Sequence, residues 1–122
     1  MRNVLVVGLG GFLGAVARHA VNLAVARLWA GPFPLGTFLI NVSGSFALGF
    51  LASVTAERLG LDPTWRLLVG TGFLGAYTTF STFEYETHRL VEAGSMAWAV
   101  ANVVTSIGAG FLAMRLGAWI GR

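Results

Sequence analysis

The sequence contains no cysteine and no lysine, and charged residues make up only 11% of its 122 positions. The absence of cysteine excludes disulfides and thiolate metal sites. A soluble domain carries roughly a quarter charged residues, so this chain is short of water-facing surface. All eight basic residues are arginines, and they are scattered singly along the sequence. Without a basic cluster to follow a phosphate backbone, binding to nucleic acid is not expected.

Apolar residues, 56% of the chain, gather in four blocks. A helix of about 20 residues crosses a hydrocarbon core about 30 Å thick. We therefore predict an all-α membrane protein with one four-helix domain over residues 1–122, with helices at about 3–28, 36–56, 65–91 and 96–118. The first block could instead be a signal peptide, but its apolar run continues to Leu28, which favours a span.

The arginines are nearly balanced between the two sides of the predicted bundle. Four spans place both termini and the 57–63 connector on one side, where we expect Arg2, Arg58, Arg66, Arg115 and Arg122. The other side receives Arg27 and Arg89, with Arg18 buried nearer to it. This bias weakly favours termini inside the cell, and a near balance also suits a protein that inserts in both orientations.

Polar and small residues recur at every fourth position of two blocks, and so lie on one face of a helix. They are Thr37, Asn41, Ser45, Gly49 and Ser53 in the second block, and Asn102, Ser106 and Gly110 in the last. Close packing of helices explains the serines and glycines. A buried amide needs several partners, so at Asn41 and Asn102 a wet or ion-lined path competes with packing.

The first block contains the glycine-rich run GLGGFLG (8–14). It lacks the G-x-G-x-x-G spacing and the βαβ unit of a dinucleotide site. We instead expect Gly10 and Gly14 to allow close contact with another helix. Arg18 follows one turn later, and a structural anchor explains it better than contact with a substrate.

The third block is interrupted by glycines and hydroxyl residues in GAYTTFSTFEYE (75–86). Because these residues form a poor helix centre, we predict a break near 75–79. Broken membrane helices leave carbonyls free for a cation and N–H groups free for an anion. Phe80 and Phe83 follow on one face, where their electropositive ring edges could stabilise a small anion. Ordinary packing of both rings in the core is the alternative.

Catalytic patterns are not evident at membrane depth. No Ser/His/Asp set or carboxylate pair lies there, so the sequence does not indicate an enzyme. Glu84 and His88 are four residues apart and could share a metal, but a solvated helix end explains them more simply.

Four pieces of the sequence resemble the CrcB/Fluc family of fluoride channels, and together they extend over nearly the whole chain. They are GGFLGAVARH (10–19), GTFLINVSGSFALGF (36–50), GFLGAYTTFSTFEYE (72–86) and the Asn/Ser/Gly stripe of the last block. The TTFSTF run after a glycine is the most specific of these. The departures are small: Gly75-Ala76-Tyr77 replaces a common Gly-Gly-Phe, His19 replaces a common tyrosine, and Asn102 stands where relatives can carry an aromatic residue.

The resemblance implies a dual-topology homodimer of two antiparallel subunits in the cell membrane, with two pores at their interface. It implies a structural, non-transported Na+ held by backbone carbonyls of Gly75 and Thr78. The implied fluoride path is lined by Asn41, Phe80, Phe83, Ser81, Thr82, Ser106 and Asn102, and the supporting residues are Arg18, Thr79 and Glu86. Transport would be passive, since the interior-negative potential drives anions outward and so relieves fluoride toxicity.

Two other functions remain as alternatives. Small multidrug transporters also have four short spans, but they need a membrane-embedded carboxylate, and this chain has none in its first, second or last block. A non-transporting assembly subunit would pass no ions in purified form.

Overall fold

Three long helices and one interrupted helical segment make up the computed structural model, which describes residues 1–57 and 62–122. The long helices are α1 (Arg2–Leu28), α2 (Leu35–Glu57) and α6 (Met96–Ile120), and each is long and apolar enough to cross a membrane. The interrupted segment comprises α3 (Pro63–Trp65), the π-helix η1 (Arg66–Leu74), α4 (Gly75–Tyr77) and α5 (Phe80–Glu92). The described residues contain no strand, which confirms the predicted all-α class.

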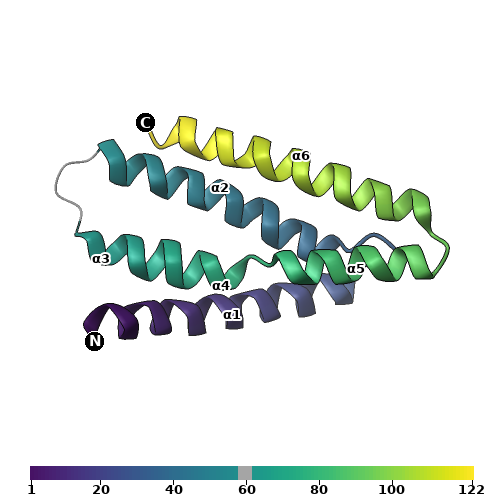
Figure 1. The fold of residues 1–122 in the computed structure, drawn as a ribbon, viewed down its shortest axis with the longest axis horizontal. Coiled ribbons are helices and arrows are strands. Elements are labelled where there is room, and N and C mark those ends of the chain that lie inside the picture. Colours follow the sequence, from purple (N-terminus) through teal and green to yellow (C-terminus); the bar gives the residue numbers. More distant parts are fainter. Residues whose placement is uncertain (58–61) are drawn as a thin grey trace.

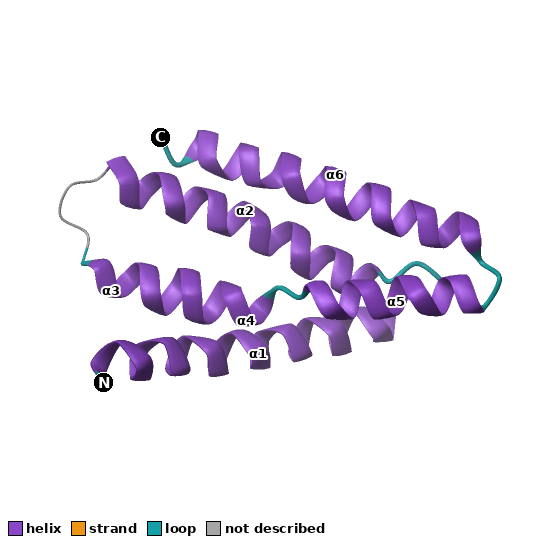
Figure 2. Ribbon diagram, viewed as in Figure 1, coloured by secondary structure: helices purple, strands orange, loops and turns teal. Residues whose placement is uncertain are grey.

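The four segments lie side by side along one direction, and both termini lie at the same end as α3 (Figure 1). Helix α2 packs along α6, while α1 packs along η1 and α4. Figure 2 shows that the chain between α4 and α5 leaves the helical path in the middle of the bundle. The observed ends lie within two residues of the predicted ones. Arg58 and most of the 57–63 connector lie outside the described residues.

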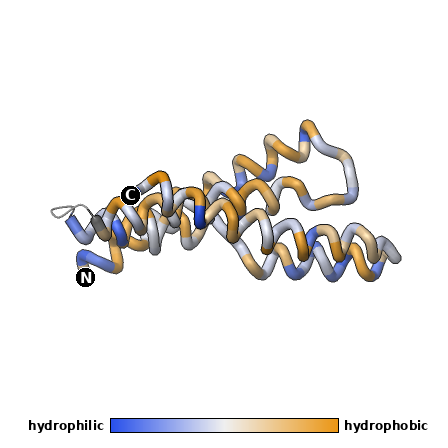
Figure 3. Tube along the Cα trace, turned by 90° about the horizontal axis from the view of Figure 1, so that it is seen from above, coloured by the Kyte–Doolittle hydropathy of each residue, from blue (hydrophilic) through white to orange (hydrophobic). Residues whose placement is uncertain are grey.

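The surface of the bundle is apolar, and several of its buried positions are polar. Large hydrophobic side chains are exposed along α1 and α6, among them Leu5, Phe12 and Phe111, and hydrophobic residues recur along most of the trace in Figure 3. Thr37 and Asn102 are buried instead. This distribution suits a chain whose surroundings are lipid or another apolar surface rather than water.

Glycines allow a very close contact between α1 and η1. A Cβ atom built on Gly10 would overlap the carbonyl oxygen of Leu68, and one built on Gly14 would overlap the carbonyl oxygen of Phe73. From the opposite side, a Cβ on Gly72 would lie 2.7 Å from the carbonyl oxygen of Val7. The predicted close contact of Gly10 and Gly14 is therefore confirmed, and it fixes η1 against α1.

The π-helix η1 was not predicted from the sequence. Its wider turn pairs residues five apart, and the N–H of Gly75 reaches the carbonyl of Gly70. Such helices are rare and cluster at functional positions. Here the π-helix ends directly before α4 and the interruption that follows it.

Candidate functional site

The helical path stops at Thr78 and Thr79, within the range where the sequence predicted a break. Both residues are extended, with φ and ψ of −76° and 157° at Thr78 and of −151° and 121° at Thr79. Asn41 on α2 holds this extended piece from the side. Its Oδ1 accepts a hydrogen bond from the N–H of Thr79 at 2.8 Å, and its Nδ2 donates to the carbonyl of Thr79 at 2.9 Å.

Two side chains replace the backbone bonds that a continuous helix would make across the break. In a continuous helix the N–H of Thr79 would bond to the carbonyl of Gly75, and the N–H of Thr82 would bond to that of Thr78. Instead the N–H of Thr79 donates to Asn41, and the N–H of Thr82 donates to the Thr79 hydroxyl at 3.3 Å. The carbonyls of Gly75 and Thr78 thereby lose their helical donors and can accept another partner.

The first turn of α5 faces the break with its backbone N–H groups. Thr79 is the N-cap residue, and its hydroxyl accepts from Thr82 while it donates to the Thr82 hydroxyl at 3.0 Å. The N–H groups of Phe80 and Ser81 precede the first intrahelical donor. Such an end carries partial positive charge and favours an anion.

A cavity of about 320 Å³ lies at the break, between α2, α6 and the interrupted segment. It brings together seven of the predicted site residues: Asn41, Gly75, Thr78, Thr79, Phe80, Phe83 and Ser106. None of the described residues that line it is charged. The cavity can therefore hold a small ion only through dipoles, N–H groups, hydroxyls and ring edges.

Few hydrogen-bond donors in this cavity are free to face a guest. The Ser106 hydroxyl donates to Asn102, and the Thr78 hydroxyl donates back to the carbonyl of Leu74. The Asn41 side-chain amide has two N–H donors, and the carbonyl of Thr79 accepts only one of them, so the second is free to donate to a guest. Ser45, part of the predicted stripe but not of the predicted site, also lines the cavity, and its hydroxyl forms no hydrogen bond with the described residues.

Phe80 and Phe83 lie together at the cavity, with ring centroids 5.8 Å apart and ring planes tilted by 41°. Their surroundings differ sharply. Phe83 is 8% exposed and belongs to the core, whereas Phe80 is 71% exposed at the surface of the single chain. Core packing therefore explains Phe83 but leaves Phe80 without a packing role within one subunit.

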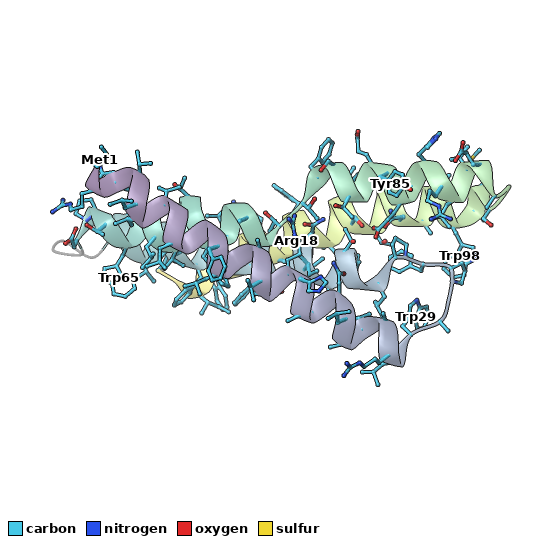
Figure 4. The ribbon with its side chains drawn as sticks, turned by 90° about the horizontal axis from the view of Figure 1, so that it is seen from below. Met1, Arg18, Trp29, Trp65, Tyr85 and Trp98 are labelled. Atoms are coloured by element: carbon cyan, nitrogen blue, oxygen red, sulfur yellow. The ribbon has the colours of Figure 1, made fainter. Side chains whose placement is uncertain are left out.

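The other predicted site residues lie outside this cavity. Ser81 is exposed on α5, and Thr82 bonds to Thr79. Arg18 is half-buried on α1, near the middle of the molecule (Figure 4), and its side chain forms no hydrogen bond or ion pair with the described residues. Asn102 is 1% exposed, and its Oδ1 accepts a hydrogen bond from the hydroxyl of Ser106, which lines the cavity.

Two polar links join α5 to its neighbours beyond the cavity. The Thr37 hydroxyl donates to Oε1 of Glu86 at 3.0 Å, while the buried Oε2 has no partner among the described residues. Asn102 donates to the Thr87 hydroxyl at 2.8 Å, which in turn donates to the carbonyl of Phe83. Sequence reasoning missed Thr87; its only signal was a hydroxyl one helical turn after Phe83.

Glu84 and His88 do not form a metal site in the described structure. His88 instead lies 3.4 Å from Glu92 on an exposed face of α5. Within residues 1–57 and 62–122, no group of three or more metal-binding side chains comes together.

Comparison with known proteins shows the family of the chain. The family model described as CrcB-like protein, Camphor Resistance (CrcB), matches residues 5–118. A protein of Acidobacterium capsulatum named fluoride-specific ion channel FluC is 48% identical over 115 residues, which are 94% of this chain and 92% of that protein. A protein of the same name from Methylobacterium nodulans is 50% identical over 110 residues, 90% of this chain and 88% of the relative. The resemblance seen in the sequence is thus confirmed, and the chain belongs to the CrcB family.

Proposed function

We propose that this protein is a fluoride-selective channel through which F− leaves the cytoplasm passively and so becomes less toxic to the cell. The observation that carries the proposal is the identity of 48% and 50%, over about nine-tenths of both chains, to relatives named fluoride-specific ion channels. These relatives are named as channels and not as enzymes, in agreement with the expectation from the sequence. The driving force is the membrane potential, about 2.3 kcal/mol per charge for each 100 mV.

The cavity at the break is the proposed anion path. Its remaining N–H donor on Asn41 and the hydroxyl of Ser45 can replace part of the ion's hydration shell. The electropositive edges of Phe80 and Phe83 can replace more of it. Because no described residue of the lining is charged, binding stays weak enough for the ion to leave again, as conduction requires. Ser81, Thr82 and Asn102 are proposed to extend the path beyond the cavity.

A second antiparallel copy is proposed to complete the path. In Figure 4 the last turns of α1 lie apart from α5 at the end away from Met1. The ring of Phe80 is exposed in the single chain and needs an apolar cover. Symmetric homodimers are the commonest assembly. The interrupted segment would then be the fourth span, in the plasma membrane, in a dimer with both orientations.

A structural Na+ is proposed at the centre of that dimer. The carbonyls of Gly75 and Thr78 have lost their helical donors, and carbonyl oxygens are ligands that hard cations accept. One subunit offers two such oxygens, so a symmetric pair would offer four. The ion would link the interrupted segments of the two subunits. Within each chain, Asn41 and the Thr79 hydroxyl accept the N–H groups that would otherwise bond to these carbonyls, so the carbonyls stay available to the ion.

Efflux from liposomes that contain only this protein tests the proposed function. We expect rapid loss of trapped fluoride and negligible loss of chloride. Flux of neither ion would indicate a non-transporting subunit. Proton-coupled export of a cationic drug, abolished by changing a single glutamate, would indicate a multidrug transporter instead.

Replacement of Na+ by a large organic cation tests the central ion separately. We expect the dimer to dissociate more readily in detergent, because the cation no longer neutralises the facing carbonyl dipoles. The measurement is the dimer fraction in cross-linking or size exclusion. Equal dimer fractions in both salts would remove the Na+ from the proposal and leave the fluoride path untouched.

A further inference from the structure

A second cavity, of about 280 Å³, lies between α2 and η1 beside the break cavity. Its lining differs in charge, because it contains Arg66 together with the hydroxyl residues Thr55 and Thr71. We infer that this space, the Arg66 cavity, is an outer binding site for a small anion on its way to the break. The inference rests on the proposed channel function and adds a positively charged entrance to the proposed path.

The two cavities adjoin each other at Leu48 and Gly70, which line both. Gly70 has no side chain at this junction. A Cβ atom built there would meet only the tip of Leu51, at 3.4 Å, so the space above the glycine is otherwise open. An ion in the Arg66 cavity therefore has a short route across Gly70 to Asn41 and Ser45.

The position of Arg66 suits an ion that must be attracted and then released. Arg66 is exposed and begins η1, at the end of the bundle where both termini lie (Figure 1). Its neighbour Trp65 is 54% exposed and projects at the same end as Met1 in Figure 4, as expected of a tryptophan at a membrane–water boundary. Water and salt there weaken the attraction, so the cation raises the local anion concentration without trapping the ion.

The donors in this cavity are Arg66 and Thr71. The Thr55 hydroxyl is committed to its own helix, since it donates to the carbonyls of Leu51 and Ala52. Among the described side chains the ion pair joins His88 and Glu92, and none of them is paired with Arg66. A guanidinium with a nearby hydroxyl recognises a small hydrated anion, and the uncharged break cavity then receives that ion with its water partly removed.

The first experiment measures fluoride efflux from liposomes of zwitterionic lipid at about 0.01 M and about 1 M ionic strength, where the screening length is roughly 30 Å and 3 Å. We expect Arg66→Gln to lower the flux about tenfold at low ionic strength and less than about twofold at high, because steering by charge is screened. Arg66→Lys should keep most of the flux. Arg115→Gln is the matched control, an exposed arginine near the same end that lines neither cavity.

Equal flux of Arg66→Gln and the unchanged protein would overturn the inference, as would a loss that does not depend on salt. If Arg66 only holds a lipid phosphate, the variant alters assembly and leaves no salt-dependent flux change, which also overturns it. Absence of fluoride flux from the unchanged protein would instead remove the proposed function, so the two failures are distinguishable.

The cysteine-free sequence allows a second, sharper test. In Arg66→Cys, a thiol reagent that attaches a trimethylammonium group should restore the flux, and one that attaches a sulfonate should lower it further. Gly70→Ala should also reduce flux by narrowing the junction, while Gly8→Ala, where a Cβ meets nothing within 4 Å, should not. Identical responses to both reagents would contradict a role for the charge.

Discussion

The two halves of the interrupted segment are held in place by different forces. The first half, η1 and α4, is glycine-rich and packs its backbone directly on the backbone of α1 at Gly10 and Gly14. The second half, α5, carries hydroxyl and charged side chains, and hydrogen bonds tie it and the break before it to α2 and α6. Close backbone packing therefore holds the first half in place, whereas hydrogen bonds hold the second.

This difference places the break at a boundary between two kinds of packing. Close backbone contact leaves η1 and α4 little freedom to shift along α1. The hydrogen bonds of the second half are directional and can exchange partners with an ion or with water. Added volume should therefore damage the first half most, and lost polarity the second.

Gly14→Ala should have the largest effect on stability, because the new methyl group overlaps the carbonyl oxygen of Phe73. Overpacking of this kind costs about 1–3 kcal/mol, occasionally more. We expect a lower thermal midpoint in detergent and loss of assembled protein. Gly8→Ala is the control, since a methyl group at Gly8 meets nothing nearby. If both variants unfold alike, shape does not hold the first half.

Asn41→Ala should weaken the break itself. It removes both hydrogen bonds to Thr79, a residue only 8% exposed, and buried groups without partners cost about 1–3 kcal/mol. Fluoride efflux should fall along with stability. Asn41→Asp keeps an acceptor for the N–H of Thr79 but adds a negative charge, so we expect efflux to fall more than stability. Thr105→Ala, which removes a hydroxyl bonded only within its own helix, serves as the control.

Phe80→Ile and Phe83→Ile should separate transport from packing. An aromatic pair contributes about 0.5–1.5 kcal/mol beyond its buried area; with a similar magnitude for a ring edge that faces an anion, each variant should slow fluoride efflux roughly two- to tenfold. Only Phe83→Ile should also lower the thermal midpoint of the dissociated subunit, because Phe80 is exposed there. Unchanged flux in both variants would count against a path lined by rings.

Protonation of Asp62, the N-cap residue of α3 just before the first half, should have the smallest effect on stability. The hydroxyl and the backbone N–H of Thr64 stabilise its carboxylate and lower the pKa of Asp62. The stabilisation is therefore present above the ordinary pKa and is lost as the pH falls through the lowered one. We expect the thermal midpoint of the unchanged protein to drop slightly between about pH 5 and pH 2 relative to Asp62→Asn. A constant difference across that range would mean that the carboxylate does not cap α3.

The sequence predicted the membrane class, the approximate helix ends, the family and the contact of α1 through its glycines. It also located the irregular residues of the third segment, because glycine and threonine weaken a helix wherever they occur. It did not predict the π-helix, because π and α turns differ only in which carbonyl each N–H reaches. It also did not pair Thr37 with Glu86, or Asn102 with Thr87, since these links join residues far apart in the chain or depend on how α5 and α6 pack.

Composition and spacing alone determined that this chain belongs in a membrane and that one of its segments is poorly suited to a continuous helix. The tertiary structure decided how the carbonyls of Gly75 and Thr78, already named from the family resemblance, become free, and where the cavities open. The physical reason is that a hydrogen bond acts over about 3 Å and along one direction. The amide of Asn41 can replace a helical partner of Thr79 only because α2 places it beside the break.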